Sequence, residues 1–331
     1  MLLARGLCVL TIALVVLCDE GPALNYSYYA KTCPRAESIV SSSIRTFLRR
    51  DRSEVAGLLR IFFHDCFVQG CDASVLLMGL NGKESEQQAV PNLTLRPKSL
   101  QAITDIKARL EKACPGTVSC ADIIALATRD AVNEAGGPWF PLPTGRKDSK
   151  SFASVQETLN NLPPPSFNAS ELLESFQSKG LNATDLVALS GAHTVGKAHC
   201  PTFSGRLRPS LDPDLDINFA QKLAATCREG DDDFATSNST DLDSSTPNRF
   251  DNAYYRNLLG KKGLLTSDQQ LFVDNRTSSL VEAFARSQRS FFSQFAASFV
   301  KLSKIQVLTG SEGEVRINCS VANPSRMLYD A

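Results

Sequence analysis

An excess of charge of either sign is missing from this sequence. Its 331 residues include 35 lysines and arginines and 35 aspartates and glutamates, so the formal net charge is zero. A protein that binds nucleic acid non-specifically needs a marked basic excess, so the balance argues against that class of partner. The apolar fraction of 43% is ordinary for a globular chain and argues against a collagen-like or wholly disordered one.

Long apolar runs are also missing beyond the first residues. The run over residues 7–17 follows Arg5 and precedes two small residues, Gly21 and Ala23. It is too short to span a bilayer as a helix, and the pattern is typical of a secretory signal peptide. A buried N-terminal helix is the alternative, but the run is apolar on every face. We therefore predict a signal peptide over 1–23 and an exported domain over 24–331, with no membrane partner.

Cysteine supports export. Two of the ten cysteines lie in the predicted signal, and the other eight are Cys33, Cys66, Cys71, Cys114, Cys120, Cys200, Cys227 and Cys319. An even count in an oxidising compartment predicts four disulfides, but the count alone does not give their pairing. Glycosylation sequons also fit export, among them Asn168, Asn182, Asn238 and Asn275.

Strand signals are few, and helical spacing dominates the chain. Apolar residues recur at helical intervals over 36–48, 100–110 and 123–132, and a Phe-rich stripe over 280–300 predicts one long helix. Pro34 and Ser99 are placed to start helices, and Gly136-Gly137 to end one. Only Ile305–Leu308 and Val315–Ile317 read as strands, together forming one short hairpin. With no repeat and no clear linker, we predict an all-α fold that forms one unit.

Histidine is scarce enough for each residue to be weighed. There are three, His64, His193 and His199. On a helix, Arg60 and His64 stand four residues apart and project from one face. A cation beside a titratable base in an apolar segment is costly unless the pair is functional or otherwise partnered. A satisfied core histidine is the alternative, and His199, beside Cys200, reads as a surface residue.

The second histidine closes a predicted helix. Asn182 is placed to cap that helix, with Asp185 at its third position, and His193 stands near its C-terminal end. Gly191 and Gly196 flank the histidine and would let a bulky group approach closely. Two histidines on separate helices could therefore hold a flat cofactor between them.

These two segments resemble the two haem-pocket motifs of the plant secretory (class III) haem peroxidases. Further motifs of that family follow in order over residues 25–320. They are Thr32-Cys33-Pro34, Val118-Ser119-Cys120-Ala121-Asp122, Gly136-Gly137-Pro138, Gly145-Arg146-Lys147-Asp148, Thr246-Pro247-Asn248-Arg249-Phe250-Asp251-Asn252 and Ser267-Asp268-Gln269. The resemblance implies the haem peroxidase fold, with one haem b between two helical lobes.

The resemblance also implies roles on the distal side of the haem. His64 would take a proton from hydrogen peroxide and return it to the leaving oxygen. Arg60 would stabilise the negative charge that develops as the O–O bond breaks. Asn92 would accept from the other imidazole nitrogen of His64, with Glu86 as its orienting partner.

On the proximal side, the resemblance makes His193 the axial ligand of the haem iron. Asp268 would accept the imidazole N–H and make the ligand more electron-donating. Pro163 matches a proline at the haem edge, where aromatic donors dock, although a proline there could simply stiffen a loop.

Two calcium sites are implied as well, because their oxygen donors suit this hard cation. The first comprises Asp65, Val68, Gly70, Asp72 and Ser74. The second comprises Thr194, Asp243, Thr246, Arg249 (through its carbonyl) and Asp251. The family's disulfides would pair Cys33 with Cys114, Cys66 with Cys71, Cys120 with Cys319 and Cys200 with Cys227. Asp122 and Arg146 resemble a buried structural ion pair.

One residue departs from the family pattern. Phe62 stands where the family commonly has a second histidine, two residues before the distal one. The change removes a polar group from the support of the pocket, which bears on its pH range and on its coupling to the distal calcium.

The function that the sequence predicts is that of a secreted, monomeric haem peroxidase. It would reduce hydrogen peroxide and oxidise phenolic donors in one-electron steps, in the cell wall or apoplast, with the vacuole as a second location. Two alternatives are a zinc hydrolase using His64, Asp65 and His193, and a disulfide-rich binding module without catalysis. The sequence lacks the HExxH motif of many zinc enzymes, and a binding module would not need the two histidines with their partners.

Overall fold

The computed structural model describes residues 24–79, 83–231, 233 and 236–324. The predicted signal peptide, 1–23, lies outside these residues. Within them the chain forms twelve α-helices and one two-stranded sheet, so the prediction of an all-α fold is confirmed. No helix among the described residues has the length and apolarity needed to cross a bilayer.

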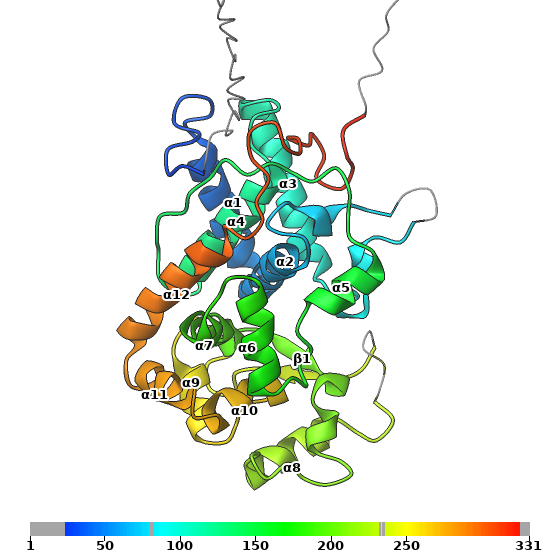
Figure 1. Cartoon of the computed structure of the whole chain (residues 1–331), viewed down its shortest axis with the longest axis vertical. Helices are drawn as coiled ribbons and strands as arrows, with labels where there is room; N and C mark the ends of the chain where they lie inside the picture. The colour runs from blue at the N-terminus through cyan, green and yellow to red at the C-terminus, as the bar shows by residue number, and fades with distance from the viewer. Residues whose placement is uncertain (1–23, 80–82, 232, 234–235, 325–331) are drawn as a thin grey trace, which may run out of the picture.

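The upper lobe is built from the first part of the chain (Figure 1). It comprises α1 (Ala36–Arg50), α2 (Val55–Val68), α3 (Pro97–Ala113), α4 (Cys120–Glu134) and α5 (Val155–Asn161). The α4 helix begins where the Ser119 hydroxyl accepts a hydrogen bond from the Asp122 N–H at 3.1 Å. Ser99 does not start α3 as predicted. Pro97 begins that helix, and buried Ser99 donates to a Glu54 carboxylate oxygen at 2.7 Å instead.

The lower lobe follows in the chain. It comprises α6 (Ala169–Ser178), α7 (Ala183–Ser190), α8 (Ile217–Thr226), α9 (Ala253–Leu259), α10 (Thr266–Val273) and α11 (Ser278–Arg286), with α8 at the lower end of the molecule. The sheet pairs β1 (Lys197–His199) with β2 (Ser239–Asp241) in antiparallel register. Residues 191–196, between α7 and β1, carry His193 to the boundary between the lobes.

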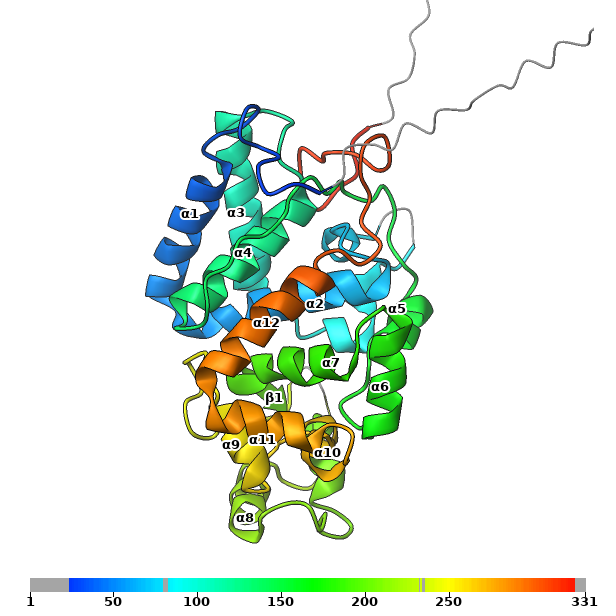
Figure 2. The ribbon, with the colours of Figure 1, turned by 60° about the vertical axis from the view of Figure 1, so that its left-hand side comes forward.

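The long Phe-rich helix that the sequence predicts is two helices. At Ser287 the backbone is extended (φ −137°, ψ 99°), and its hydroxyl accepts from the Ser290 N–H, which starts α12 (Gln288–Leu302). The apolar spacing continues through the break because both helices bury their apolar faces in the same core. From this break α12 runs diagonally from the lower lobe to the upper one (Figure 2).

The predicted hairpin near the C-terminus is wrong. Leu308 and Glu314 do not pair with each other, because both form bridges to the segment at residues 147–148. The Lys147 N–H donates to the Leu308 carbonyl at 2.8 Å, and the Asp148 N–H donates to the Glu314 carbonyl at 2.7 Å. A distant segment therefore separates the two runs that looked like one hairpin.

Disulfides and a buried ion pair join segments that lie apart in the sequence. The structure contains the four disulfides that the resemblance implied, Cys33–Cys114, Cys66–Cys71, Cys120–Cys319 and Cys200–Cys227. The buried Asp122–Arg146 ion pair is also present, at 2.7 Å. Arg146 donates in addition to the Ser303 carbonyl just after α12, so the C-terminal segment is fastened to the upper lobe.

Candidate active site

The helix α2 presents Arg60 and His64 on one face, as their spacing predicts. His64 is buried, and its Nδ1 lies 2.5 Å from Oδ1 of Asn92. The Asn92 amide donates through Nδ2 to the Glu86 carbonyl at 2.7 Å, which fixes its oxygen toward the imidazole. His64 therefore donates from Nδ1 and keeps the lone pair on Nε2.

Electrostatics keep His64 in its neutral form. Burial, together with the charge of Arg60, lowers the pKa of His64 to about 3, although the hydrogen bond to Asn92 opposes the shift. Burial lowers the pKa of Arg60 to about 10, so the guanidinium stays charged at neutral pH. Arg60 also donates to the Pro91 carbonyl at 2.6 Å, and the turn at 90–92 therefore positions both Arg60 and Asn92.

The second histidine follows the end of α7. Asn182 and Asp185 form the capping box that starts this helix, as predicted. His193 lies in the short 3₁₀ turn Gly191–Thr194 that follows it. Its Nδ1 lies 2.7 Å from Oδ1 of Asp268, in the first turn of α10.

Asp268 shifts the pKa of His193 upward, whereas the pKa of His64 is lowered. Burial lowers the pKa of His193, but the charge and the hydrogen bond of Asp268 outweigh it, so the pKa stands above its ordinary value. The same carboxylate accepts from the Tyr254 hydroxyl at 3.0 Å and from the Leu265 N–H at 3.2 Å. These two donors fix Asp268, although the side chain of His193 itself remains 39% exposed.

The structure shows why glycines flank His193, which the sequence alone did not explain. A Cβ at Gly191 would collide with the Tyr255 hydroxyl and the Phe291 ring, so the close neighbours are side chains of this chain. Gly196 has φ +102°, and a Cβ there would stand 2.8 Å from Cβ of Ala56 on α2. The segment that carries His193 therefore packs directly against the helix that carries His64.

The charge of Arg60 affects the pKa of both imidazoles. The Arg60 guanidinium lowers the pKa of His64 and acts in the same direction on His193. The hydrogen bonds of each ring within the described part of the chain use Nδ1 alone, which leaves Nε2 of both rings without a partner there. Figure 2 shows α2, which carries His64, above α7, the helix that leads to the 191–194 turn.

A loop at the end of α2 gathers the first predicted oxygen cluster. Asp65 accepts from the Ala73 N–H through Oδ2 at 3.1 Å, and Asp72 accepts from the Ser74 N–H at 2.9 Å. Oδ1 of Asp65 and Oγ of Ser74 are buried and make no hydrogen bond to any described residue. Gly70 turns the chain here with φ +119°, and the loop is closed by the Cys66–Cys71 disulfide.

The second predicted cluster lies beside His193. The Thr194 hydroxyl donates to Oδ2 of Asp243 at 2.9 Å, and the Thr246 hydroxyl lies 3.1 Å from Oδ1 of Asp251. Hydrogen bonds therefore join two carboxylates and two hydroxyls in one cluster. The exposed side chain of Arg249 lies outside this group, with Nε 3.6 Å from Oδ2 of Asp251.

Comparison with known proteins decides what this arrangement is. The model of the peroxidase family matches residues 40–287. The chain belongs to the peroxidase family. Cationic peroxidase SPC4 of Sorghum bicolor is 54% identical over 304 residues, which cover 92% of this chain and 83% of that protein. Peroxidase 12 of Arabidopsis thaliana is 49% identical over 300 residues, covering 91% and 83% of the two chains. Peroxidase 4 of Vitis vinifera is 44% identical over 305 residues, covering 92% and 94%.

Family membership establishes the activity at the level of the enzyme class. The chain is a class III haem peroxidase, an oxidoreductase that uses hydrogen peroxide to oxidise donors, and proteins of this class bind haem and calcium. The zinc hydrolase and the non-catalytic binding module are therefore set aside. The first alternative also lacks a site, because no group of three His, Cys, Asp or Glu side chains in the described ranges could hold a metal ion.

The residues fit a peroxidase haem. A haem iron needs one imidazole whose ring is oriented by a hydrogen bond from its other nitrogen. His193 meets this need, since Asp268 holds Nδ1 and raises the pKa of the ring. A peroxidase also needs a neutral base on the opposite side, and His64 is buried and neutral.

The residues of the first oxygen cluster fit calcium. Burial and the nearby Asp72 raise the pKa of Asp65, a cost that a divalent cation would reverse. The unpartnered Asp65 Oδ1 and Ser74 Oγ are oxygen atoms of the kind that calcium takes. With only two carboxylates in each cluster, hydroxyl and carbonyl oxygens would complete both ligand sets.

Phe62, the departure from the family pattern, faces away from the pocket. It is 1% exposed and stacks on Phe299 of α12, with ring centroids 4.4 Å apart. Phe63, the next residue, lies edge-on to His64 and packs against Phe67. At the position where the family commonly has a histidine, this chain therefore has an aromatic side chain that packs against α12.

Some contributors were not predicted from the sequence. Tyr254 bonds to Asp268, and Asn257 donates to Oδ1 of Asp243 at 2.7 Å; both follow the 246–252 motif at helical spacing, the one available signal. Glu86, by contrast, was expected as the orienting partner of Asn92, and the contact is made by its main-chain carbonyl. His199, predicted to be a surface residue, is half-buried at the end of β1 and bonds to the Ser237 carbonyl at 3.0 Å.

Proposed function

We propose that His64 is the acid–base residue of this peroxidase and that His193 binds the haem iron. The observation that carries the proposal is the opposite partnering of the two rings, an amide oxygen for His64 and a carboxylate for His193. When bound, haem supplies the redox chemistry, the reduction of peroxide and the one-electron oxidation of donors.

The distal residues handle the proton. Nε2 of His64 accepts a proton from hydrogen peroxide, while Nδ1 keeps its own proton on the bond to Asn92. The imidazolium then donates from Nε2 to the departing oxygen as water leaves. Arg60, held by the Pro91 carbonyl, stabilises the negative charge that develops on the oxygen atoms.

The proximal residues hold the ligand. Asp268 accepts from Nδ1 of His193 and so directs Nε2 toward the metal position. Thr194 follows His193 in the chain, and a calcium ion bound with Asp243 and Asp251 would brace the ligand directly. The first cluster, with Asp65 and Asp72, would brace the C-terminal end of α2 in the same way.

Phenolic donors are the substrates that we propose, in agreement with the class of enzyme. Pro163 lines a cavity of about 350 Å³ whose other walls include Leu162, Phe167 and α6. Apolar side chains beside exposed polar ones suit an aromatic ring that carries a hydroxyl group. Docking at Pro163 predicts that removing its ring, as in Pro163→Ala, raises KM for phenols and leaves the peroxide reaction unchanged.

Export from the cell, in monomeric form, completes the proposal. The four disulfides support an oxidising destination, the cell wall or apoplast, with the vacuole as the second location. The exposed sequon residues Asn168 and Asn182 cap helices through Oδ1 and leave Nδ2 for a glycan. Buried Asn92, also in a sequon, uses both side-chain atoms. Glycopeptide mapping of the secreted protein should find glycans on Asn168 and Asn182, no glycan on Asn92, and Leu24 as the N-terminal residue. Gel filtration should show a monomer.

The decisive experiment for the activity site is an absorption spectrum. Purified holoenzyme should show a haem Soret band that changes on one equivalent of hydrogen peroxide and returns when a phenol is added. A protein that binds haem but whose spectrum ignores peroxide would overturn the distal assignment. A protein that binds no haem would overturn the proximal one.

A further inference from the structure

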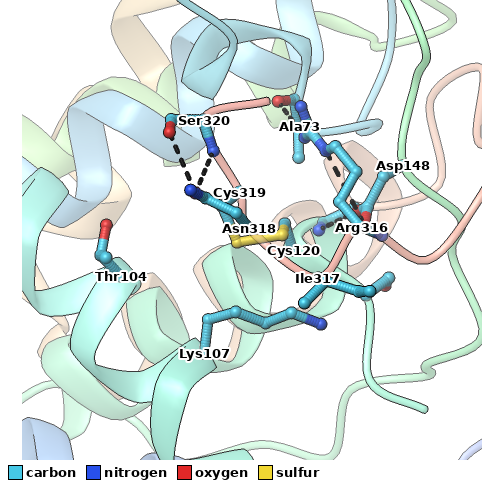
Figure 3. Close-up of a disulfide and its surroundings, with 12 residues drawn as sticks. Ala73, Thr104, Lys107, Cys120, Asp148, Arg316, Ile317, Asn318, Cys319 and Ser320 are labelled. Atoms are coloured by element: carbon cyan, nitrogen blue, oxygen red, sulfur yellow. Dashed lines mark hydrogen bonds and ion pairs between the residues drawn. A yellow bond between two sulfur atoms is a disulfide. The ribbon is translucent and has the colours of Figure 1, made fainter. Parts of the chain in front are cut away.

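The C-terminal segment brings a buried cation to the first oxygen cluster. Arg316 is fully buried, and its Nη2 donates to the Ala73 carbonyl at 2.6 Å. Ala73 lies between Asp72 and Ser74 and adopts φ 60°, a left-handed conformation that is uncommon for a residue other than glycine. The guanidinium thus holds the strained residue in the middle of the loop (Figure 3).

Buried carboxylates surround Arg316. Burial lowers the pKa of this arginine, and the charges of Asp148, Asp65 and Asp72 act against that shift. Glu86 is also fully buried and interacts with Asp65 and Asp72, so the buried negative charges beside the loop outnumber the one guanidinium. Nε and Nη1 of Arg316 make no hydrogen bond to any residue in the described part of the chain.

Main-chain contacts tie the same segment to both sides of the loop. Asp148 accepts from the Arg316 N–H at 2.9 Å and, through its other oxygen, from the Ala121 N–H at 2.9 Å. The Ser149 N–H donates to the Asp72 carbonyl, and the Met78 N–H donates to the Ser320 carbonyl.

A covalent bond anchors that segment. Cys319, three residues after Arg316, is joined to Cys120 at the start of α4 (Figure 3). The guanidinium is therefore held at the loop both by hydrogen bonds and by a disulfide.

We propose that Arg316 is a positioning residue of the distal calcium site, through which the C-terminal segment sets how tightly calcium is held. The inference rests on the proposed assignment of calcium to this loop. Arg316 touches no ligand atom. It acts through the Ala73 carbonyl, and coupling of this kind is reciprocal, so calcium also stabilises the C-terminal segment.

The first test is calcium retention in Arg316→Lys holoenzyme. Lysine keeps the charge but is too short and has the wrong geometry to reach Ala73 while it stays beside Asp148. We expect one of two calcium ions to be lost at a chelator concentration about tenfold lower than in the wild type, while the other is retained. Ile317→Ala, which truncates an exposed neighbour, is the control and should match the wild type.

The second test needs no variant. When the more weakly held calcium is removed from wild-type holoenzyme, amide exchange of residues 314–321 should accelerate at least tenfold, while α8 stays unchanged. Wild-type retention in folded Arg316→Lys, or exchange at 314–321 that ignores calcium, overturns the inference. If Arg316→Lys does not fold, the exchange experiment alone decides. Wild-type protein that holds calcium only at the Thr194 cluster overturns the assignment of the first cluster itself, a separate outcome.

Discussion

The two histidines of the proposed haem pocket differ in the group that accepts from Nδ1 of each ring. His64 bonds through Nδ1 to a neutral amide oxygen, and its pKa falls to about 3. His193 bonds through Nδ1 to a carboxylate, and its pKa rises above the ordinary value. Both rings feel burial and the charge of Arg60, so the acceptor on Nδ1 makes the difference.

The comparison teaches that the partner of a histidine specifies its role more sharply than the histidine does. A neutral acceptor fixes the tautomer without stabilising the imidazolium, so the ring remains a base over most of the pH range. A charged acceptor makes the ring more electron-donating and suits a metal ligand. Exchanging or removing these partners is therefore the most direct way to test the proposed roles.

Removing the distal imidazole should have the largest effect. In His64→Ala the reaction with hydrogen peroxide is expected to slow by about two to four orders of magnitude, because no other base replaces Nε2. Haem should remain bound, since His193 is untouched. Stopped-flow absorbance measures both, and His199→Ala, which alters the third histidine at the end of β1, should behave like the wild type. Unchanged peroxide kinetics in His64→Ala would remove the distal role.

Neutralising the proximal carboxylate should have the next largest effect. Asp268→Asn keeps the shape but loses the charge that raises the pKa of His193, so burial then dominates and the pKa falls. The reaction with peroxide should slow about 10- to 100-fold, and the reduction potential of the holoenzyme should become more positive. A potential equal to that of the wild type would show that Asp268 does not tune the ligand.

Giving His64 a charged partner should raise its pKa, as Asp268 raises that of His193. In wild-type enzyme, peroxide reactivity should persist until the pH approaches about 3, because His64 must be neutral to act as a base. In Asn92→Asp the imidazolium is stabilised and the pKa of His64 rises. The acid limb of the peroxide rate should therefore move to higher pH by at least about one unit, roughly a tenfold loss on that limb.

The control for that exchange is Asn133→Asp, which adds the same charge on the exposed side of α4. Its pH profile should follow the wild type. An acid limb that moves equally in both variants would attribute the shift to net charge rather than to the partner of His64.

Removing a single donor to Asp268 should have the smallest effect. Tyr254→Phe deletes the hydroxyl that lies 3.0 Å from Oδ1 of Asp268, the oxygen that His193 also uses. The freed carboxylate interacts more strongly with the imidazole, so the reduction potential should move slightly negative, opposite to Asp268→Asn. Rates should change by about fivefold or less. A shift in the same direction as Asp268→Asn would mean that the hydroxyl strengthens the bond between Asp268 and His193 instead of competing with it.

Much of the fold followed from helical spacing, and the failures have a common cause. Spacing identifies the buried face of a helix but is blind to a break that leaves that face continuous, as at Ser287 between α11 and α12. The hairpin failed because strand pairing depends on a segment 160 or so residues away in the chain, at Lys147 and Asp148. The pairing of distant segments has no local signature, whereas the cap at Ser287 is a local signal that the continuous apolar spacing concealed.

The site divides in the same way. Motifs carried His64, Asn92, His193 and Asp268, because a motif is read from side chains and these four residues act through theirs in the proposed site. The carbonyls of Glu86 and Pro91, which position the distal pair, have no side-chain signature. Partners such as Tyr254 become visible only once the fold brings helices together.

The route of the chain constrains the order in which this protein can be completed. Cys120 pairs with Cys319 across 199 residues, and buried Asp148 accepts from the Arg316 N–H, which also lies near the C-terminus. During synthesis the first half of the molecule therefore emerges before Cys120 and Asp148 can meet these partners. The protein can complete its fold only after the C-terminal segment has been synthesised. Chains truncated near the C-terminus should therefore be exported poorly.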